Sequence, residues 1–273
     1  MPGLSEELQS LMGKYRFRPG RRFSQNFMIS QEAIEGIVSE ARLSKSDIVL
    51  EIGCGTGFLT RELLKHCRVV GFEIDERLFA LLDAEIKDEN FTLRKEDFLN
   101  AKLPKFSKIV STPPYGISTQ LMHLLFMLDF KLAVLVFENA FAEKITAFAG
   151  LRDYCATAVL SQYFFRIELL QAVPADSFFP KPPNPSRVVR FESAREHGKV
   201  AEEQLFADFV CELFRHKNKN LSNSLDYSKA WIVENLKFKE EFSKALEEKL
   251  LGRKVNLLEV KEIVKLFNAL CKK

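Results

Sequence analysis

Several features are scarce in this sequence of 273 residues, and each absence excludes a class of protein. No apolar run is long enough to cross a membrane, and the N-terminus carries basic and polar residues but no signal-type apolar core. The cysteines are scattered, with no C-x-x-C pair and no histidine cluster beside them, which argues against a zinc site. They are Cys54, Cys67, Cys155, Cys211 and Cys271. We therefore expect a cytoplasmic protein with reduced, structural cysteines and no bound metal.

The composition, 47% hydrophobic and 28% charged, is that of a soluble globular enzyme, and the length allows one large and one smaller domain. The net charge of +3 is too small to indicate a nucleic-acid partner, so its distribution matters more. Basic residues crowd an N-terminal arm over residues 1–22, with Tyr15 and Phe17 between them. These basic residues are Lys14, Arg16, Arg18, Arg21 and Arg22. On a flexible arm they suit a phosphate backbone and unstacked bases, and a solvated tail is the alternative.

The rest of the sequence is organised around the run 49–57, Val-Leu-Glu-Ile-Gly-Cys-Gly-Thr-Gly. It predicts a buried strand ending in a glycine turn, and residues 58–64 continue with apolar residues at helical spacing. Glycines let backbone N–H groups approach a ligand closely. A dinucleotide fingerprint needs G-x-G-x-x-G, whereas Gly57 follows Gly55 by only two residues. This spacing resembles motif I of S-adenosylmethionine-dependent methyltransferases, although a plain connection after a strand has the same appearance.

Acidic residues follow the next two expected strands. Glu73 ends the apolar run 69–72, where a βαβ unit presents a carboxylate to a ribose, and Asp75 suits the N-cap of the following helix. Asp97 follows a short strand at 91–93 and has two possible roles, to accept a hydrogen bond from the exocyclic amine of an adenine or to cap a turn. This series favours a cofactor site over a plain connection.

The stretch 108–118 runs from a fourth strand into Thr112-Pro113-Pro114-Tyr115. Prolines end strand pairing abruptly, and proline carbonyls without a competing N–H are acceptors for an amine. Tyr115 offers a face on which a flipped base can stack. Acceptors aimed at an amine make its nitrogen nucleophilic without a strong general base, so positioning supplies most of the rate. We therefore expect the glycine turn and this corner to face the same cavity.

In six motifs, taken in order, the chain resembles the KsgA/dimethyladenosine transferase family, including its archaeal members. They are residues 24–28 (SQNFM), 51–57 (EIGCGTG), 73–75 (EID), 96–97 (ED), 175–182 (ADSFFPKP) and 213–219 (LFRHKNK). The resemblance implies a Rossmann-like α/β methyltransferase domain, with a seven-stranded, mostly parallel sheet, and a small all-α C-terminal domain. It also implies S-adenosylmethionine as cofactor and dimethylation of two adjacent adenosines in the 3′-terminal hairpin of small-subunit rRNA.

The resemblance also assigns residues. It implies a cofactor site of Asn26, Met28, Gly53, Gly55, Glu73, Asp97 and Thr112. The target adenine would meet Thr112, Pro113, Tyr115 and Phe178, flipped between the last two rings. RNA would be held by Arg16, Arg18, Arg21, Arg22, Arg215, Lys217 and Lys219, for which a solvated helix end is the alternative at the last three. The expected partner is the pre-small ribosomal subunit, bound by a monomer.

Three departures from the family pattern keep alternatives open. Ser24 replaces glycine, Cys155-Ala156 replaces Gly-Arg, and Thr112-Pro113 stands where the family has Asn followed by an apolar residue. A hydroxyl lacks the geometry of a carboxamide, and losing one aimed acceptor costs about a hundredfold in rate. The alternatives are a methylation-impaired ribosome-assembly factor and an adenine methyltransferase for another rRNA site. A small-molecule methyltransferase would not need the basic arm.

The remaining patterns predict the organisation. We expect domains at 23–193 and 199–273, joined by a polar link at 193–198, with helices from residue 200 onward. Residues 31–42 form an apolar helical stripe, expected to pack on the sheet edge. Residues 156–165 are expected to form a long strand, antiparallel to residues 187–191.

Overall fold

The computed structural model describes residues 3–20, 25–194, 196–238, 241–242 and 246–271, which form two compact units. Unit 1 comprises Met1–Ala142 and Ile167–Ser193, and unit 2 comprises Glu143–Arg166 and Ala194–Lys273. Residues 143–166 thus group with unit 2, although the sequence places them in the methyltransferase domain, and the expected domain boundaries stay a prediction. Within the described ranges, no helix combines the length and apolar character that a membrane crossing requires.

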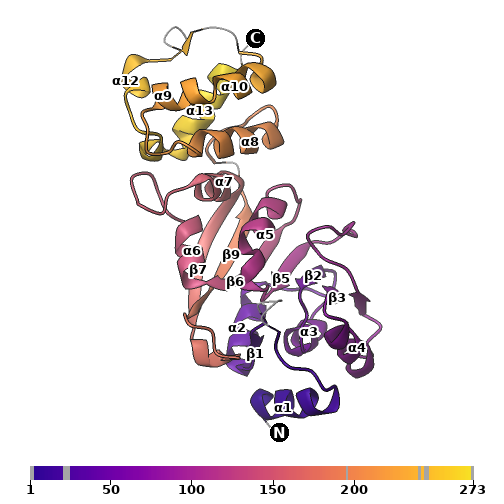
Figure 1. Cartoon of the computed structure of the whole chain (residues 1–273). Coiled ribbons are helices and arrows are strands. Elements are labelled where there is room, and N and C mark those ends of the chain that lie inside the picture. The colour runs from indigo at the N-terminus through magenta and orange to yellow at the C-terminus, as the bar shows by residue number, and fades with distance from the viewer. Residues whose placement is uncertain (1–2, 21–24, 195, 239–240, 243–245, 272–273) are drawn as a thin grey trace. The chain divides into compact units, whose positions relative to one another are not determined.

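Unit 1 is built on a seven-stranded sheet in the order β4-β3-β2-β5-β6-β9-β7 (Figure 1). The first five strands in this order are parallel to their neighbours, and β9 pairs antiparallel with β6. The strands are β2 (Ile48–Ile52), β3 (Arg68–Phe72), β4 (Phe91–Arg94), β5 (Lys108–Ser111), β6 (Leu132–Glu138), β7 (Phe165–Val173) and β9 (Ser186–Ser193). The expected Rossmann-like, mostly parallel α/β fold is confirmed.

Both faces of the central strands β2, β5 and β6 are buried, as expected for parallel strands that carry helices on each side. Val49, Val69 and Val134 share one apolar cluster with the first four helices, whereas their neighbours Leu50 and Leu135 are equally buried outside that cluster. The helices are α1 (Leu4–Lys14), α2 (Gln31–Glu40), α3 (Phe58–Leu64), α4 (Glu76–Glu85) and α5 (Ser118–Leu125). A further helix, α6 (Asn139–Ile145), crosses the division between the units.

The helix α2 does not lie at the sheet edge, as its sequence led us to expect. It contacts α3 and the internal strand β6, with Ile34 and Ile37 completely buried. The prediction was wrong because β9 and β7 extend the sheet beyond β6, which turns an expected edge into a covered face.

The long strand expected at 156–165 was also wrong. Residues Ala156–Phe164 form the helix α7, and the strand β7 begins only at Phe165. The helix buries Leu160 and Phe164 together with the polar Thr157 and Ser161. A short apolar segment buried around its whole circumference has no helical stripe, so periodicity does not separate it from a buried strand.

The N-terminal segment is folded onto unit 1, which corrects the expectation of a flexible arm with free aromatic rings. Phe17 is 2% exposed, and its ring meets that of Phe27 edge to face at 5.9 Å. The Tyr15 hydroxyl donates to Glu85 on α4, which also accepts from Lys14. Tyr15 and Phe17 are therefore parts of the fold, and neither is a free platform for unstacked bases.

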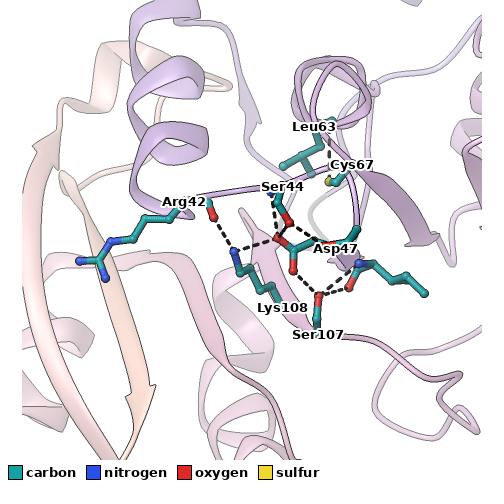
Figure 2. Close-up of polar contacts among 9 residues, drawn as sticks. Arg42, Ser44, Asp47, Leu63, Cys67, Ser107 and Lys108 are labelled. Carbon is teal, nitrogen blue, oxygen red and sulfur yellow. Dashed lines mark hydrogen bonds and ion pairs between the residues drawn. The ribbon is translucent and has the colours of Figure 1, made fainter.

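A buried polar network joins the beginnings of β2 and β5 (Figure 2). The Nζ of Lys108 lies 3.0 Å from Oδ2 of Asp47 and also donates to the carbonyl of Arg42. The Asp47 carboxylate accepts further hydrogen bonds from the backbone and hydroxyl of Ser44 and from the hydroxyl of Ser107. Both charges are thus paired and hydrogen-bonded, as buried charges must be.

Unit 2 is helical after residue 194, in the part that the structure describes. Its helices are α7 and, after residue 194, α8 (Glu203–Phe214), α9 (Leu221–Tyr227), α10 (Lys229–Leu236), α12 (Glu248–Leu251) and α13 (Val260–Leu270). Their core is aromatic, with the ring of Phe267 in contact with those of both Phe206 and Phe209. The last helix begins with a capping box between Glu259 and Glu262.

Candidate active site

The glycine turn connects β2 to α3 and takes a conformation that only glycine adopts readily. Gly53, Gly55 and Gly57 have φ values of 71°, 59° and 79°, all in the left-handed region. A Cβ on Gly57 would lie 2.7 Å from Cδ1 of Ile86, so a side chain has no room there. At Gly55 a Cβ would come within 3.3 Å of the Phe27 ring. The turn is therefore tightly held between α4 and the N-terminal segment.

Glu73 follows β3 and points back to the glycine turn. Its Oε2 accepts from the backbone N–H of Gly55 at 2.9 Å, and its Oε1 accepts from that of Asp75 at 2.8 Å. Burial raises the pKa of Glu73, although the two backbone hydrogen bonds oppose this. Each carboxylate oxygen keeps a second lone pair, so a ribose diol has acceptors available at this side chain.

Asp75 is the N-cap of α4, as predicted. Its Oδ1 accepts from the backbone N–H of Arg77 at 3.0 Å. Its Oδ2 accepts from the amide of Gln25 at 3.1 Å, and the same amide group of Gln25 accepts from the N–H of Gly20. The residues after the N-terminal arm are thereby fixed to the acidic end of β3.

Asp97 caps a turn, which is one of the two roles that the sequence left open, and its role toward an adenine stays a prediction. Its Oδ1 accepts from the backbone N–H of Leu99 at 3.0 Å and its Oδ2 from the side chain of Asn100 at 2.8 Å, as in a turn cap. The side chain is also exposed at the wall of the cavity described below. Capping the turn fixes the carboxylate in place beside the cavity.

The Thr112-Pro113-Pro114-Tyr115 corner is held against the glycine turn. At the end of β5 the hydroxyl of Ser111 donates to the carbonyl of Ile52 at 2.6 Å and accepts from its N–H at 3.2 Å. A Cβ on Gly53 would lie 3.3 Å from Cδ of Pro114. The two features face the same space, which confirms the geometric expectation from the sequence.

This space is a cavity of about 440 Å³ within unit 1, in the size range of small-molecule sites. Every residue predicted for the cofactor and the target adenine lines it. They are Asn26, Met28, Gly53, Gly55, Glu73, Asp97, Thr112, Pro113, Tyr115 and Phe178. Asn26 and Met28 reach it because β1 (Phe27–Met28) pairs antiparallel with β8 (Phe178–Phe179).

Tyr115 and Phe178 lie together at one end of the cavity. Their ring centroids are 6.4 Å apart and the ring planes meet at 73°, an edge-to-face contact. A base stacked between two rings needs them parallel, so the two aromatics do not form a ready-made slot for the adenine. One ring has to turn before a base can lie between them.

The buried groups of the cavity fit S-adenosylmethionine, the expected cofactor. Glu51 is one of the residues that line the cavity, and its buried Oε2 has no hydrogen-bond partner of normal geometry among the described residues, although the Thr60 hydroxyl and the Cys54 thiol lie near the carboxyl group. Burial raises the pKa of Glu51 to about 8. An ammonium group of a bound cofactor would supply the missing partner, and the glycine turn leaves the backbone accessible to it.

The predicted RNA-binding residues lie in both units. Arg16 and Arg18 are exposed in unit 1, whereas Arg21 and Arg22 lie outside the described residues. The other three follow α8 in unit 2 and differ in their contacts. Arg215 pairs with Glu212, Lys217 donates to the carbonyls of Arg152 and Tyr154, and Lys219 is exposed. Because its ammonium binds two carbonyls of a loop within unit 2, Lys217 has a structural role, and its RNA-binding role stays a prediction.

Some residues of the cavity were not identified from the sequence. Ile74 is 53% exposed at its wall, and an apolar residue between Glu73 and Asp75 was the available signal. Gln25 also lines the cavity, its side-chain amide donates a hydrogen bond to Asp75, and no sequence pattern indicates that contact. Among the described residues, no group of acidic, histidine and cysteine side chains is suited to hold a metal ion.

Comparisons with known proteins show the family of the chain. The model of the family described as ribosomal RNA adenine dimethylase matches residues 16–270. The probable ribosomal RNA small subunit methyltransferase A of Methanopyrus kandleri is 34% identical over 257 residues, which cover 92% of this chain and 92% of that protein. The crystal structure of a dimethyladenosine transferase from Plasmodium falciparum matches with a TM-score of 0.74 and 25% identity, over 89% of this chain and 95% of that one.

The 23S rRNA methyltransferase ErmE has the same fold, with a TM-score of 0.63 at 24% identity, over 90% of this chain and 100% of that one. The family model spans nearly the whole chain. The chain therefore belongs to the ribosomal RNA adenine dimethylase family and is an S-adenosylmethionine-dependent rRNA adenine dimethyltransferase.

Proposed function

We propose that the protein dimethylates two adjacent adenosines in the 3′-terminal hairpin of small-subunit rRNA, on a pre-small ribosomal subunit. The observation that carries this proposal is the single cavity into which separate motifs bring all ten predicted residues. The relative from Methanopyrus kandleri is named as a small-subunit methyltransferase, which favours this substrate over another rRNA.

In this proposal Gly53, Gly55, Asn26 and Met28 enclose the cofactor, and Glu73 accepts hydrogen bonds from its ribose. Asp97 accepts from the exocyclic amine of its adenine. S-adenosylmethionine, when bound, supplies an electrophilic methyl group on a sulfonium. The protein's own contribution is to position that group and to exclude water around it.

At the other end of the cavity, Thr112 and the carbonyl of Pro113 accept hydrogen bonds from the N6 amine of the target adenine. This draws the nitrogen lone pair out of conjugation with the ring and directs it at the methyl group. Tyr115 and Phe178 supply stacking faces for the base, at an unstacking cost of a few kcal/mol. The basic residues Arg16 and Arg18, with Arg215, Lys217 and Lys219 in unit 2, contact phosphates.

Thr112 favours a second candidate function, a ribosome-assembly factor that binds the small subunit and methylates poorly. A threonine hydroxyl accepts in a less defined direction than a carboxamide oxygen, and the lost acceptor corresponds to about a hundredfold in rate. We expect wild-type protein to transfer methyl groups slowly and Thr112→Asn to raise the rate, up to about a hundredfold.

The test uses small subunits that lack the modification, labelled S-adenosylmethionine and mass analysis of the adenosines. Dimethyladenosine at two adjacent hairpin positions supports the proposed function. Modification at another position favours a different rRNA site. Binding to the subunit without methylation, with activity restored by Thr112→Asn, supports the assembly factor.

A further inference from the structure

We propose that Ser186 is a positioning residue that holds Tyr115 as the fixed wall of the target-base site, so that Phe178 is the wall that moves. This inference rests on the proposed function of the cavity. The hydroxyls of Tyr115 and Ser186 are hydrogen-bonded to each other, across 71 residues of sequence. No sequence motif assigned a role to Ser186.

The serine is well placed to fix the ring. It is completely buried at the start of β9, where it pairs in register with Glu138 at the end of β6. Its neighbours are tied to the same strand end. Asn184 donates to Oε1 of Glu138 at 2.6 Å, and the carbonyl of Pro185 accepts from the N–H of Asn139 at 3.0 Å. The Ser186 hydroxyl is thus an anchor with little freedom of its own.

Tyr115 is constrained from both ends. Its backbone begins a short 3-10 helix directly after two prolines, and the hydroxyl at the far end of its ring is bonded to Ser186. Burial raises the pKa of Tyr115, so the phenol keeps its proton and the hydrogen bond persists at neutral pH. Swinging the ring away about the Cα–Cβ bond would move its hydroxyl, break this bond and leave the buried serine hydroxyl without the partner it has here, so the hydrogen bond fixes the position of the ring.

Phe178 is 3% exposed and packs in the apolar cluster of unit 1, but its ring has no polar group through which a hydrogen bond could fix it. Its backbone is paired with Met28 in the β1–β8 ribbon, but the side chain is held by packing and by the edge-to-face contact with Tyr115. When a base stacks on Tyr115, the ring that turns to receive it is therefore the phenylalanine. The base site then forms by induced fit against one fixed wall.

The test places 2-aminopurine, a fluorescent adenine analogue without the N6 amine, at the target position of the hairpin. Its fluorescence falls when it stacks on an aromatic ring, and this readout does not need methyl transfer. Ser186→Ala, Tyr115→Phe and the double variant are compared with wild type for quenching, for kcat and KM, and for cofactor Kd. The matched control is Ser161→Ala, a completely buried serine of unit 2 whose hydroxyl has no partner among the described residues.

We expect Ser186→Ala and Tyr115→Phe each to reduce quenching and to lower kcat/KM about five- to tenfold, the range for one lost hydrogen bond. The double variant should be no worse than either single one, because both remove the same bond. The cofactor Kd should not change in any of them, which distinguishes positioning of the ring from general damage to the cavity. Ser161→Ala should behave as wild type.

The inference is overturned if Ser186→Ala matches Ser161→Ala, or if the two single losses multiply in the double variant. Should Ser186→Ala fail to fold, Tyr115→Phe removes the same bond from a half-buried position, and unchanged quenching there also overturns it. If wild-type protein quenches the 2-aminopurine fluorescence and Ser186→Ala reduces that quenching, but no methyl group is transferred, only the proposed function is contradicted. Absence of quenching in wild type would overturn both.

Discussion

Replacing Lys108 with methionine tests how strongly the buried network of Figure 2 stabilises unit 1. The change keeps most of the side-chain volume but removes the cation that lies 3.0 Å from Asp47. Removing one partner of a buried pair costs about 3–5 kcal/mol, because the other charge is left buried. Three hydrogen bonds from Ser44 and Ser107 remain on the carboxylate, so we expect the lower end of this range, about 3 kcal/mol.

The assay is urea unfolding followed by far-ultraviolet circular dichroism, with hydrogen exchange of the β2 and β5 amides to assign the loss to unit 1. The control is Lys95→Met, which breaks an ion pair with Glu76 between largely exposed side chains and should leave stability nearly unchanged. If Lys108→Met and Lys95→Met lose the same free energy of unfolding, the network does not stabilise the fold as argued.

The same network predicts acid sensitivity. Burial alone would raise the pKa of Asp47, but hydrogen bonds from Lys108, Ser107 and Ser44 outweigh it and hold the pKa below its ordinary value of 3.8. A lowered pKa in the folded state stabilises the protein above the unfolded-state pKa, and this stabilisation is lost as the pH falls below it. As the pH falls from about 5 to about 2, the free energy of unfolding should therefore decrease less for Lys108→Met than for wild type.

Two further predictions concern the cofactor end of the cavity. Burial raises the pKa of Glu51 from 4.5 to about 8, so between these pH values the folded protein keeps a proton that the unfolded chain releases. The free energy of unfolding should therefore fall as the pH rises from 4.5 to about 8. Glu51→Gln, neutral throughout, should flatten that slope in urea titrations without cofactor, and an unchanged slope contradicts the assignment. Phe17→Leu removes the ring that supports Phe27 and should raise the cofactor Kd about three- to tenfold by calorimetry, while leaving RNA affinity unchanged. Weaker RNA binding with an unchanged cofactor Kd would instead support the free-arm interpretation.

The convergence of the site could be predicted because the topology requires it. Gly53, Glu73, Asp97 and Thr112 each follow a parallel strand, and the carboxyl ends of parallel strands meet at one edge of the sheet. The positions of these motifs along the sequence therefore predict which residues lie close together in the folded protein. The role of Asp75 could be predicted equally well, because an N-cap depends only on the next turn of the chain.

What could not be predicted depends on packing between distant segments. Phe17 looked like an exposed aromatic among basic residues, and only the position of Phe27 shows why it is buried. The apolar run around Leu160 fits a strand or a buried helix equally well, because most of its residues are buried and no helical stripe distinguishes the two. Lys108 gave no sign in the sequence that Asp47 would be its partner.

The two-residue ribbon of β1 and β8 links residues proposed for the cofactor site to residues proposed for the base site. Phe27 pairs with Phe179 and Met28 with Phe178, so one short ladder joins a residue proposed for the cofactor site to a residue proposed for the base site. So small a ladder has little stability of its own and depends on what each strand contacts. If the two sites lie as proposed, binding of the methyl donor on the β1 side should change the stability of β8, and therefore the affinity for the target base.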